Sequence, residues 1–163
     1  ISGNHYHPLT MTPQNQMGSW VMKMKSADEV KTSNTTLAND NTLTVDMLAS
    51  TKYSIRGKIF YNTPTAADFK WRHTGPAAFG VRVRRASIAP GATAYGNVAV
   101  DTAYSAADIV ILETSGSDGF IEFDAYINNQ TAGTFAIQWA QNTSNGSGTT
   151  VNGNSYLEYQ IRG

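Results

Sequence analysis

The first candidates for chemistry are the three histidines of this 163-residue sequence. His5 and His7 flank Tyr6, and in an extended segment this spacing points both imidazoles to the same side, as two metal ligands would lie. Two imidazoles without a neighbouring acid or cysteine leave a coordination sphere incomplete within one chain. His73 follows Trp71 by two positions, which favours a packed and hydrogen-bonded place in a core. We therefore predict no metal site.

Acidic residues are the second candidates, because paired carboxylates serve as acid and base in glycoside hydrolysis. Glu122 and Asp124 lie on one face of an expected strand, and Glu113 is expected nearby. Such pairs are also common on solvent faces of antiparallel sheets, where basic strands offer them partners. The sequence has no P-loop, dinucleotide-binding glycine motif, zinc-protease motif or nucleophile-elbow motif. We predict no catalytic residues, no cofactor and no enzymatic activity.

Aromatic residues are the third candidates, because exposed aromatic faces stack on sugar rings. The chain has eight Tyr and three Trp residues. Trp20, Trp71 and Trp139 each lie on the apolar side of an alternating segment, which indicates burial. We expect all three tryptophans to belong to the core and not to a sugar platform.

The segments that must position these residues alternate with period two and are separated by turns rich in Gly, Pro and Asn, as in antiparallel sandwiches. In the first segment, Trp20, Met22 and Met24 are assigned to the inner face, and Lys23 and Lys25 to the outer face. The pattern predicts an all-β, antiparallel, jelly-roll-like β-sandwich of about ten strands. The expected strands cover residues 20–25, 43–47, 53–61, 68–74, 79–87, 97–100, 109–113, 120–128, 134–141 and 156–161.

The chain is predicted to have an extended arm, residues 1–18, followed by one sandwich domain, residues 19–163. The arm shows no sustained period and is rich in Pro, Asn and Gln, so it cannot bury enough apolar surface to order alone. Tyr6, Pro8, Leu9 and Met11 are the residues that it could lay on a partner. The alternatives of a docked and a frayed arm both stay open.

Net charge is zero, but the charges are sorted along the chain. From Lys52 to Arg85 eight basic residues face one acid, and from Ala86 to Gly163 seven acids face one base. One interpretation is cross-strand pairing within a sheet. The other is a contact between the basic face of one copy and the acidic face of the next. Candidates for that inter-subunit contact are Arg82, Arg84, Arg85, Glu122 and Asp124.

Composition excludes several other classes. The absence of cysteine excludes a disulfide framework and thiolate zinc sites. A nucleic-acid-binding domain normally carries an overall basic excess, which this neutral chain lacks, so we expect no nucleic-acid partner. The apolar runs are far shorter than the about 20 residues of a membrane-spanning helix, so we expect no membrane partner.

Several strings in the sequence resemble a group of small β-sandwich proteins encoded among the structural genes of tailed bacteriophages. The similarity extends from about Lys31 to the C-terminus and does not include the arm. The resemblance implies a virion component and brings no active-site residues with it. The strings that carry it are residues 34–40, 53–60, 69–76, 137–142 and 155–159.

Two functions are compatible with this resemblance. The first is a capsid decoration or cement protein on the outer head surface, expected to be a homotrimer that binds the major capsid protein through its arm. The second is a tail-fibre or receptor-binding module that grips host surface glycan, for which the Asn-, Ser-, Gly- and Thr-rich loop 142–154 is suitable. We expect the decoration protein and keep the receptor-binding module as the alternative.

Overall fold

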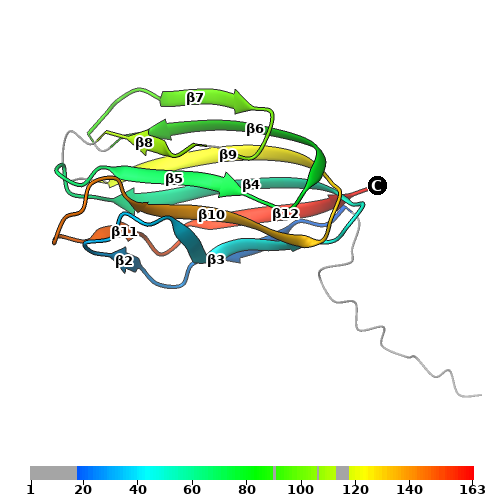
Figure 1. The fold of residues 1–163 in the computed structure, drawn as a ribbon, viewed down its shortest axis with the longest axis horizontal. Coiled ribbons are helices and arrows are strands. Elements are labelled where there is room, and N and C mark those ends of the chain that lie inside the picture. The colour runs from blue at the N-terminus through cyan, green and yellow to red at the C-terminus, as the bar shows by residue number, and fades with distance from the viewer. Residues whose placement is uncertain (1–17, 90, 106, 113–117) are drawn as a thin grey trace, which may run out of the picture.

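The fold was analysed in a computed structural model, which describes residues 18–89, 91–105, 107–112 and 118–163. Within these residues the chain forms antiparallel strands and no helix (Figure 1). The predicted all-β sandwich is thus confirmed. The strands are β1 (Val21–Met24), β2 (Glu29–Lys31), β3 (Ala38–Met47), β4 (Lys52–Asn62), β5 (Phe69–Thr74), β6 (Ala78–Ile88), β7 (Gly96–Asp101), β8 (Ile109–Ile111), β9 (Asp118–Asn129), β10 (Gly133–Gln141), β11 (Thr149–Val151) and β12 (Tyr156–Arg162).

The strands form two sheets that pack face to face. The eight-stranded sheet has the order β1-β12-β4-β9-β6-β7, with β11 beside β4 and β2 beside β11, and the four-stranded sheet has the order β3-β10-β5-β8. In Figure 1, β7 lies along the upper edge and β2 along the lower edge. The described residues hold twelve strands where the sequence predicted about ten. The two additional strands, β2 and β11, are three residues long, too short to show an alternation, and they pair with each other.

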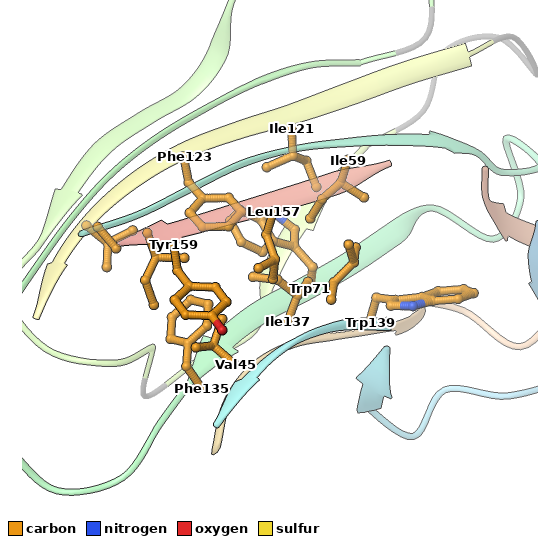
Figure 2. Packing of buried hydrophobic residues seen from close by; sticks show 14 of the residues in the cluster. Val45, Ile59, Trp71, Ile121, Phe123, Phe135, Ile137, Trp139, Leu157 and Tyr159 are labelled. Carbon is orange, nitrogen blue, oxygen red and sulfur yellow. The ribbon is translucent and has the colours of Figure 1, made fainter. Parts of the chain in front are cut away.

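The core lies between the sheets and consists of the inward side chains of the long alternating strands (Figure 2). The predicted inner faces of β3, β4, β5 and β6 are confirmed, since their alternate apolar residues are buried. Trp71 and Trp139 are 1% and 0% exposed. Trp139 stacks on Phe69 with a centroid distance of 6.0 Å, and Phe69 stacks on Tyr61 at 4.3 Å. Large aromatic rings therefore fill one end of the sandwich.

The prediction for the first strand is wrong, because its two faces are exchanged. Trp20 is 40% exposed, and Met22 and Met24 also point to solvent, whereas Lys25 is buried. In the register with β12, Val21 lies opposite Tyr159 and Lys23 opposite Leu157, so these positions face the core. The Arg56 guanidinium lies 4.3 Å from the centre of the Trp20 ring, which covers part of this exposed indole.

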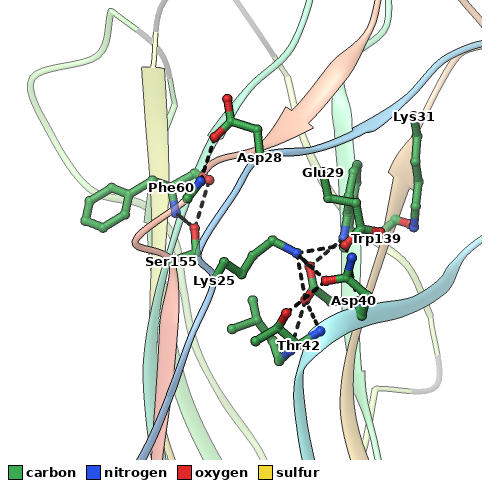
Figure 3. Close-up of polar contacts among 12 residues, drawn as sticks. Lys25, Asp28, Glu29, Lys31, Asp40, Thr42, Phe60, Trp139 and Ser155 are labelled. Carbon is green, nitrogen blue, oxygen red and sulfur yellow. Dashed lines mark hydrogen bonds and ion pairs between the residues drawn. The ribbon is translucent and has the colours of Figure 1, made fainter.

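The burial of Lys25 is explained by a dense set of acceptors (Figure 3). Its Nζ donates to Asp40 Oδ2 at 2.9 Å, to Glu29 Oε2 at 2.7 Å and to Asn41 Oδ1 at 2.8 Å. Asp40 Oδ2 also accepts from Trp139 Nε1 at 3.1 Å, and Asp40 Oδ1 accepts from the backbone amides of Thr42 and Leu43. Removing two charges from water is tolerated only when they are paired and fully hydrogen-bonded, as they are here. The cluster joins the end of β1 to β3 and β10.

We expect Trp71→Ala and Trp139→Ala each to lower the free energy of unfolding by about 3–5 kcal/mol, the cost of deleting a large buried aromatic side chain. The matched control is Trp20→Ala, which removes an exposed ring and one cation–π contact and should cost about 1 kcal/mol or less. Urea denaturation of the three purified variants measures these differences. Equal losses in all three would contradict the assignment of Trp20 to the surface.

Breaking the buried ion pair is expected to destabilise the fold strongly. Lys25→Met leaves the Asp40 carboxylate buried without its cation, which costs about 3–5 kcal/mol in such pairs. Lys58→Met is the control, because the Lys58–Glu122 pair is 3.8 Å long and partly exposed, and such pairs contribute about 0–1 kcal/mol. Thermal unfolding at pH 7 distinguishes the two variants. A Lys25→Met protein as stable as Lys58→Met would show that the cluster stabilises nothing.

Candidate functional site

The outward surface of the eight-stranded sheet, here called the outer face, is the candidate functional site. It consists of the side chains of β1, β12, β4, β9, β6 and β7 that point away from the core. One row of cross-strand partners crosses all six strands. In order, the row contains Met22, Glu158, Arg56, Asp124, Arg84 and Val100. Alternating charges in the middle of the row are thus bounded by an apolar residue at each edge.

The charges in the middle of the outer face pair within the chain. Arg56 Nε lies 2.6 Å from Glu158 Oε2, and Arg84 Nη1 lies 3.2 Å from Asp124 Oδ2. In the next row Glu122 lies opposite Lys58, with 3.8 Å between Oε2 and the lysine Nζ. Its Oε1 lies 3.9 Å from Nη2 of Arg84 in the first row. Cross-strand pairing of the basic and acidic strands, one of the two interpretations of the charge sorting, is therefore confirmed.

The predicted inter-subunit residues do not all lie on this surface. Arg82, Arg84, Glu122 and Asp124 point outward. Arg85 points between the sheets instead, with a side-chain exposure of 15%, and donates from Nε to Asp101 Oδ2 at 2.8 Å. Successive side chains of a strand point to opposite faces, and Arg85 directly follows the outward Arg84 along β6. Arg85 is therefore not part of the outer face.

The apolar edges of the outer face are exposed. On β1 the exposed residues are Met22 and Met24, preceded by Trp20, and on β7 they are Val98 and Val100, the former 65% exposed. Both strands are outermost in the sheet order, so one side of each has no strand partner among the described residues. Contiguous exposed apolar residues beside a polar rim mark contact surfaces in many proteins.

A pocket of about 460 Å³ opens on the outer face where β12, β4, β9 and β6 run side by side. Its lining includes Tyr53, Val81 and Ile127, whose side chains belong to the core. Its rim is formed by outward residues of four strands and the loop after β7. These rim residues are Lys52, Arg162, Tyr126, Asn128, Gly80, Arg82 and Thr102. No carboxylate is among the lining residues.

A second polar cluster lies between the sheets, around His73. His73 is buried on β5, and its Nε2 lies 3.0 Å from Asp101 Oδ2. Burial lowers the pKa of His73, despite the hydrogen bond to Asp101, which acts in the opposite direction. Burial alone would raise the pKa of Asp101, but the hydrogen bonds from Arg85 and His73 lower it. The two pKa shifts favour, at neutral pH, an uncharged His73 ring whose Nε2 donates to the ionised Asp101 carboxylate.

This cluster lacks the geometry of a nucleophilic triad. The other ring nitrogen, Nδ1 of His73, is buried and has no hydrogen-bond partner in the described structure. The Ser105 hydroxyl accepts from the backbone amide of His73 at 3.4 Å and not from the ring. A general base must reach the proton that it removes, and among the described residues no hydroxyl is hydrogen-bonded to Nδ1 of His73. The cluster instead links β5 of one sheet to β6 and β7 of the other.

Seven residues considered in the sequence analysis lie outside the described part of the chain. They are Glu113 and, in the arm, His5, Tyr6, His7, Pro8, Leu9 and Met11. In the part of the chain that the structure describes, no group of three or more His, Cys, Asp or Glu side chains is close enough to hold a metal ion. The same part contains no helix long and apolar enough to cross a membrane.

Sequence reasoning missed the pocket, although single signals of it were present. Tyr126 and Arg82 occupy outward positions of expected strands, and Lys52 directly precedes the expected strand 53–61. Their meeting depends on the registers in which Lys52 lies opposite Asn128 and Arg162, and Tyr126 lies opposite Arg82. These registers join segments that are distant in the sequence. The alternation within one segment does not determine its register with a neighbouring strand.

Comparisons with known proteins assign no family. No protein-family model matches the chain, and no curated protein matches it. Among solved structures, a chain described as the structure of infectious bursal disease virus Gx strain is 12% identical, with a TM-score of 0.23, over 99% of this chain and 47% of its own length. A chain of the Gt strain is 10% identical, with a TM-score of 0.19, over 98% and 40%. The present chain spans less than half of each, and TM-scores this low establish no common fold.

The His73 cluster predicts a pH dependence of stability. Because the folded state lowers the pKa of His73 below its usual 6.5, the unfolded chain binds this proton more readily. The stability contributed by neutral His73 is therefore complete above about pH 6.5 and declines as the pH falls below it. Asp101, whose pKa is lowered from 3.8, contributes stability that is lost only at still lower pH.

We expect urea denaturation between pH 7 and pH 5 to show a decline in the free energy of unfolding that is smaller in His73→Gln. Glutamine keeps a donor for Asp101 but does not titrate. His5 and His7 are present in both proteins and cancel in the difference. An equal decline in both proteins would show that His73 does not titrate differently on folding.

Proposed function

We propose that this chain is a non-enzymatic structural subunit of a virion, specifically a capsid decoration protein of a tailed bacteriophage. In this proposal it forms a homotrimer, binds the major capsid protein through residues 1–18 and lies on the outer capsid surface. The outer face supplies the contact between copies. The observation that carries the proposal is the row of six partners that runs from Met22 through four alternating charges to Val100.

The row supports association between copies in a ring. Its two apolar ends lie on opposite edges of one sheet, so the β1 edge of one copy is free to meet the β7 edge of the next. A contact between two different surfaces closes into a ring when the rotation between copies closes. The charged middle of the row is neutral in sum, so neighbouring copies would not accumulate repulsion.

The strand order gives further support by analogy. Consecutive strands largely alternate between the two sheets, as in β2 to β6 and β7 to β11. We interpret this alternation as jelly-roll-like. Jelly rolls include viral capsid domains and lectins, so the analogy favours both the decoration protein and the alternative of a receptor-binding module.

The receptor-binding alternative has one specific observation in its favour, the basic pocket on the outer face. A tail-fibre module that grips host glycan needs a concave site with a few converging polar groups, and this pocket has them. Copy number and position in intact particles, seen by electron cryomicroscopy, distinguish the two functions. A signal confined to the tail would replace the decoration proposal by this alternative.

A pair of charge variants tests the ring contact. We expect Met22→Lys and Val100→Glu each to reduce the trimer, three times 17.6 kDa, to monomers in light scattering, because each buries an unpaired charge at the contact. The double variant should restore the trimer if the two edges meet. Leu112→Glu, exposed but outside the row, is the control and should leave the mass unchanged. A monomeric wild-type protein, or a double variant no larger than the singles, contradicts the ring.

Deletion of residues 1–18 tests the arm separately. The truncated protein should keep the mass of the intact protein but no longer rebind to capsids stripped of it. Truncated protein that still decorates such capsids would contradict the docking role of Tyr6, Pro8, Leu9 and Met11.

A further inference from the structure

Three cations of the outer face differ from the other three. Arg56, Lys58 and Arg84 each form an ion pair with a carboxylate of the same face. The remaining cations are Lys52, Arg82 and Arg162, and none forms an ion pair with a carboxylate in the described part of the chain. All three line the same 460 Å³ pocket. The unpaired positive charge of this face is therefore collected at one place.

The arrangement places like charges next to each other. Arg162 lies directly opposite Lys52 in the β12–β4 register, and like charges in opposite positions destabilise a sheet. Arg82 lies on β6, which is separated from β4 by β9. Near Arg82 the outward residues of β9 are Tyr126 and Asn128, neither of which is acidic. An anion placed between the three cations would remove this repulsion and gain three charge-assisted contacts.

The chain's own N-terminal segment does not supply that anion. Gly18 lies next to this region, since its amide donates to the Ile161 carbonyl at 3.2 Å. The segment that precedes it, residues 1–17, contains no Asp or Glu. This segment therefore offers the three cations no carboxylate.

The neutral groups around the cations indicate what kind of anion fits. Tyr126 is more than half exposed and presents an aromatic ring, with the Arg162 guanidinium 5.5 Å from its centre. Asn128 and Thr102 add an amide and a hydroxyl to the lining. An aromatic face with neutral hydrogen-bonding groups suits a sugar ring and its hydroxyls. The volume is within the range of about 300–1,000 Å³ for small-ligand pockets.

An unpartnered hydroxyl lies in an adjoining pocket. Ser54 is 4% exposed, and its Oγ has no hydrogen-bond partner in the described structure. Ser54 is opposite Tyr126 in the β4–β9 register. It lines a smaller pocket of about 90 Å³ that shares Tyr126 and Arg162 with the larger one and also contains Trp20. A buried polar atom without a partner is costly, and a ligand hydroxyl reaching it would remove that cost.

We propose that this pocket binds a carboxylated sugar residue of a glycan. The carboxylate lies among Lys52, Arg82 and Arg162, and the ring packs on Tyr126. Nucleic acid fits less well, since the neutral chain offers one stacking ring here and lacks the basic excess of such binders. The inference does not depend on the virion proposal, because the pocket lies within one chain and its test requires neither a capsid nor an oligomer.

Gly80 provides a way to block the site. A Cβ atom added at Gly80 would meet no atom within 4 Å, and Gly80 lines the pocket. Gly80→Val therefore adds a side chain at the pocket whose Cβ meets no protein atom. This variant tests whether the ligand occupies the pocket, because it reduces the space there without changing any charge.

The experiment titrates the full chain with sialyllactose and with a galacturonate trisaccharide, by NMR chemical shifts and calorimetry, with lactose as the neutral comparison. We expect saturable binding of at least one carboxylated sugar and at least about tenfold weaker binding of lactose. Arg82→Gln, Lys52→Gln and Gly80→Val should each weaken the binding by about tenfold, with the thermal midpoint recorded for each variant. Arg72→Gln, on β5 of the other sheet and outside the pocket, should not change it.

Several results would overturn the proposal. These are the absence of saturable binding by either carboxylated sugar, equal binding of lactose, and an equal loss of affinity in Arg72→Gln. Binding of polyglutamate or oligothymidylate as tight as that of the carboxylated sugars would assign the site to an acidic peptide or a nucleic acid instead. A folded Gly80→Val protein with unchanged affinity would place the ligand elsewhere.

Discussion

The pairing of β4 with β9 is the constraint on which both faces of the molecule depend. Eleven residue pairs join these strands in one antiparallel register, from Lys52 opposite Asn128 to Asn62 opposite Asp118. Because side chains alternate, this register buries Ile55 and Ile59 and also places Arg56 opposite Asp124 on the outside. A shift of one residue would exchange the two faces, exposing the core and burying the charges. Hydrophobic burial and charge pairing therefore specify the same register.

The sequence predicted the long strands well because their alternation is sustained and one face is uniformly apolar, as in β3 and β4. It failed at β1, where both faces of a four-residue strand carry long side chains with apolar carbon atoms. The outcome there is decided by Lys25, which is buried only because Asp40 and Glu29 surround it. The residues that compensate the charge of Lys25 lie on other segments, so the alternation of residues 20–25 cannot show that Lys25 is buried. The alternation alone therefore assigned the wrong face to the core.

The sequence allowed single residues of the candidate site to be predicted, but not which of them lie next to each other in the fold. Arg84, Glu122 and Asp124 were recognisable as outward charges, and whether they pair within one chain or between two is decided by strand register. The pocket needs the registers of three neighbouring strand pairs at once, which place the outward residues of β12, β4, β9 and β6 around it. The inner polar cluster around His73 is different, because its side chains bond to one another between the two sheets.

The lysine buried at the end of β1 also affects how the N-terminal segment is attached. Trypsin cuts after Lys and Arg, and residues 1–22 contain neither. The first two possible cleavage points are Lys23, within the hydrogen-bonded β1, and Lys25, whose ammonium is enclosed by carboxylates. Proteases act on locally opened backbone. While the fold holds, trypsin should therefore leave residues 1–22 attached, and their release would report the opening of the sandwich at this edge.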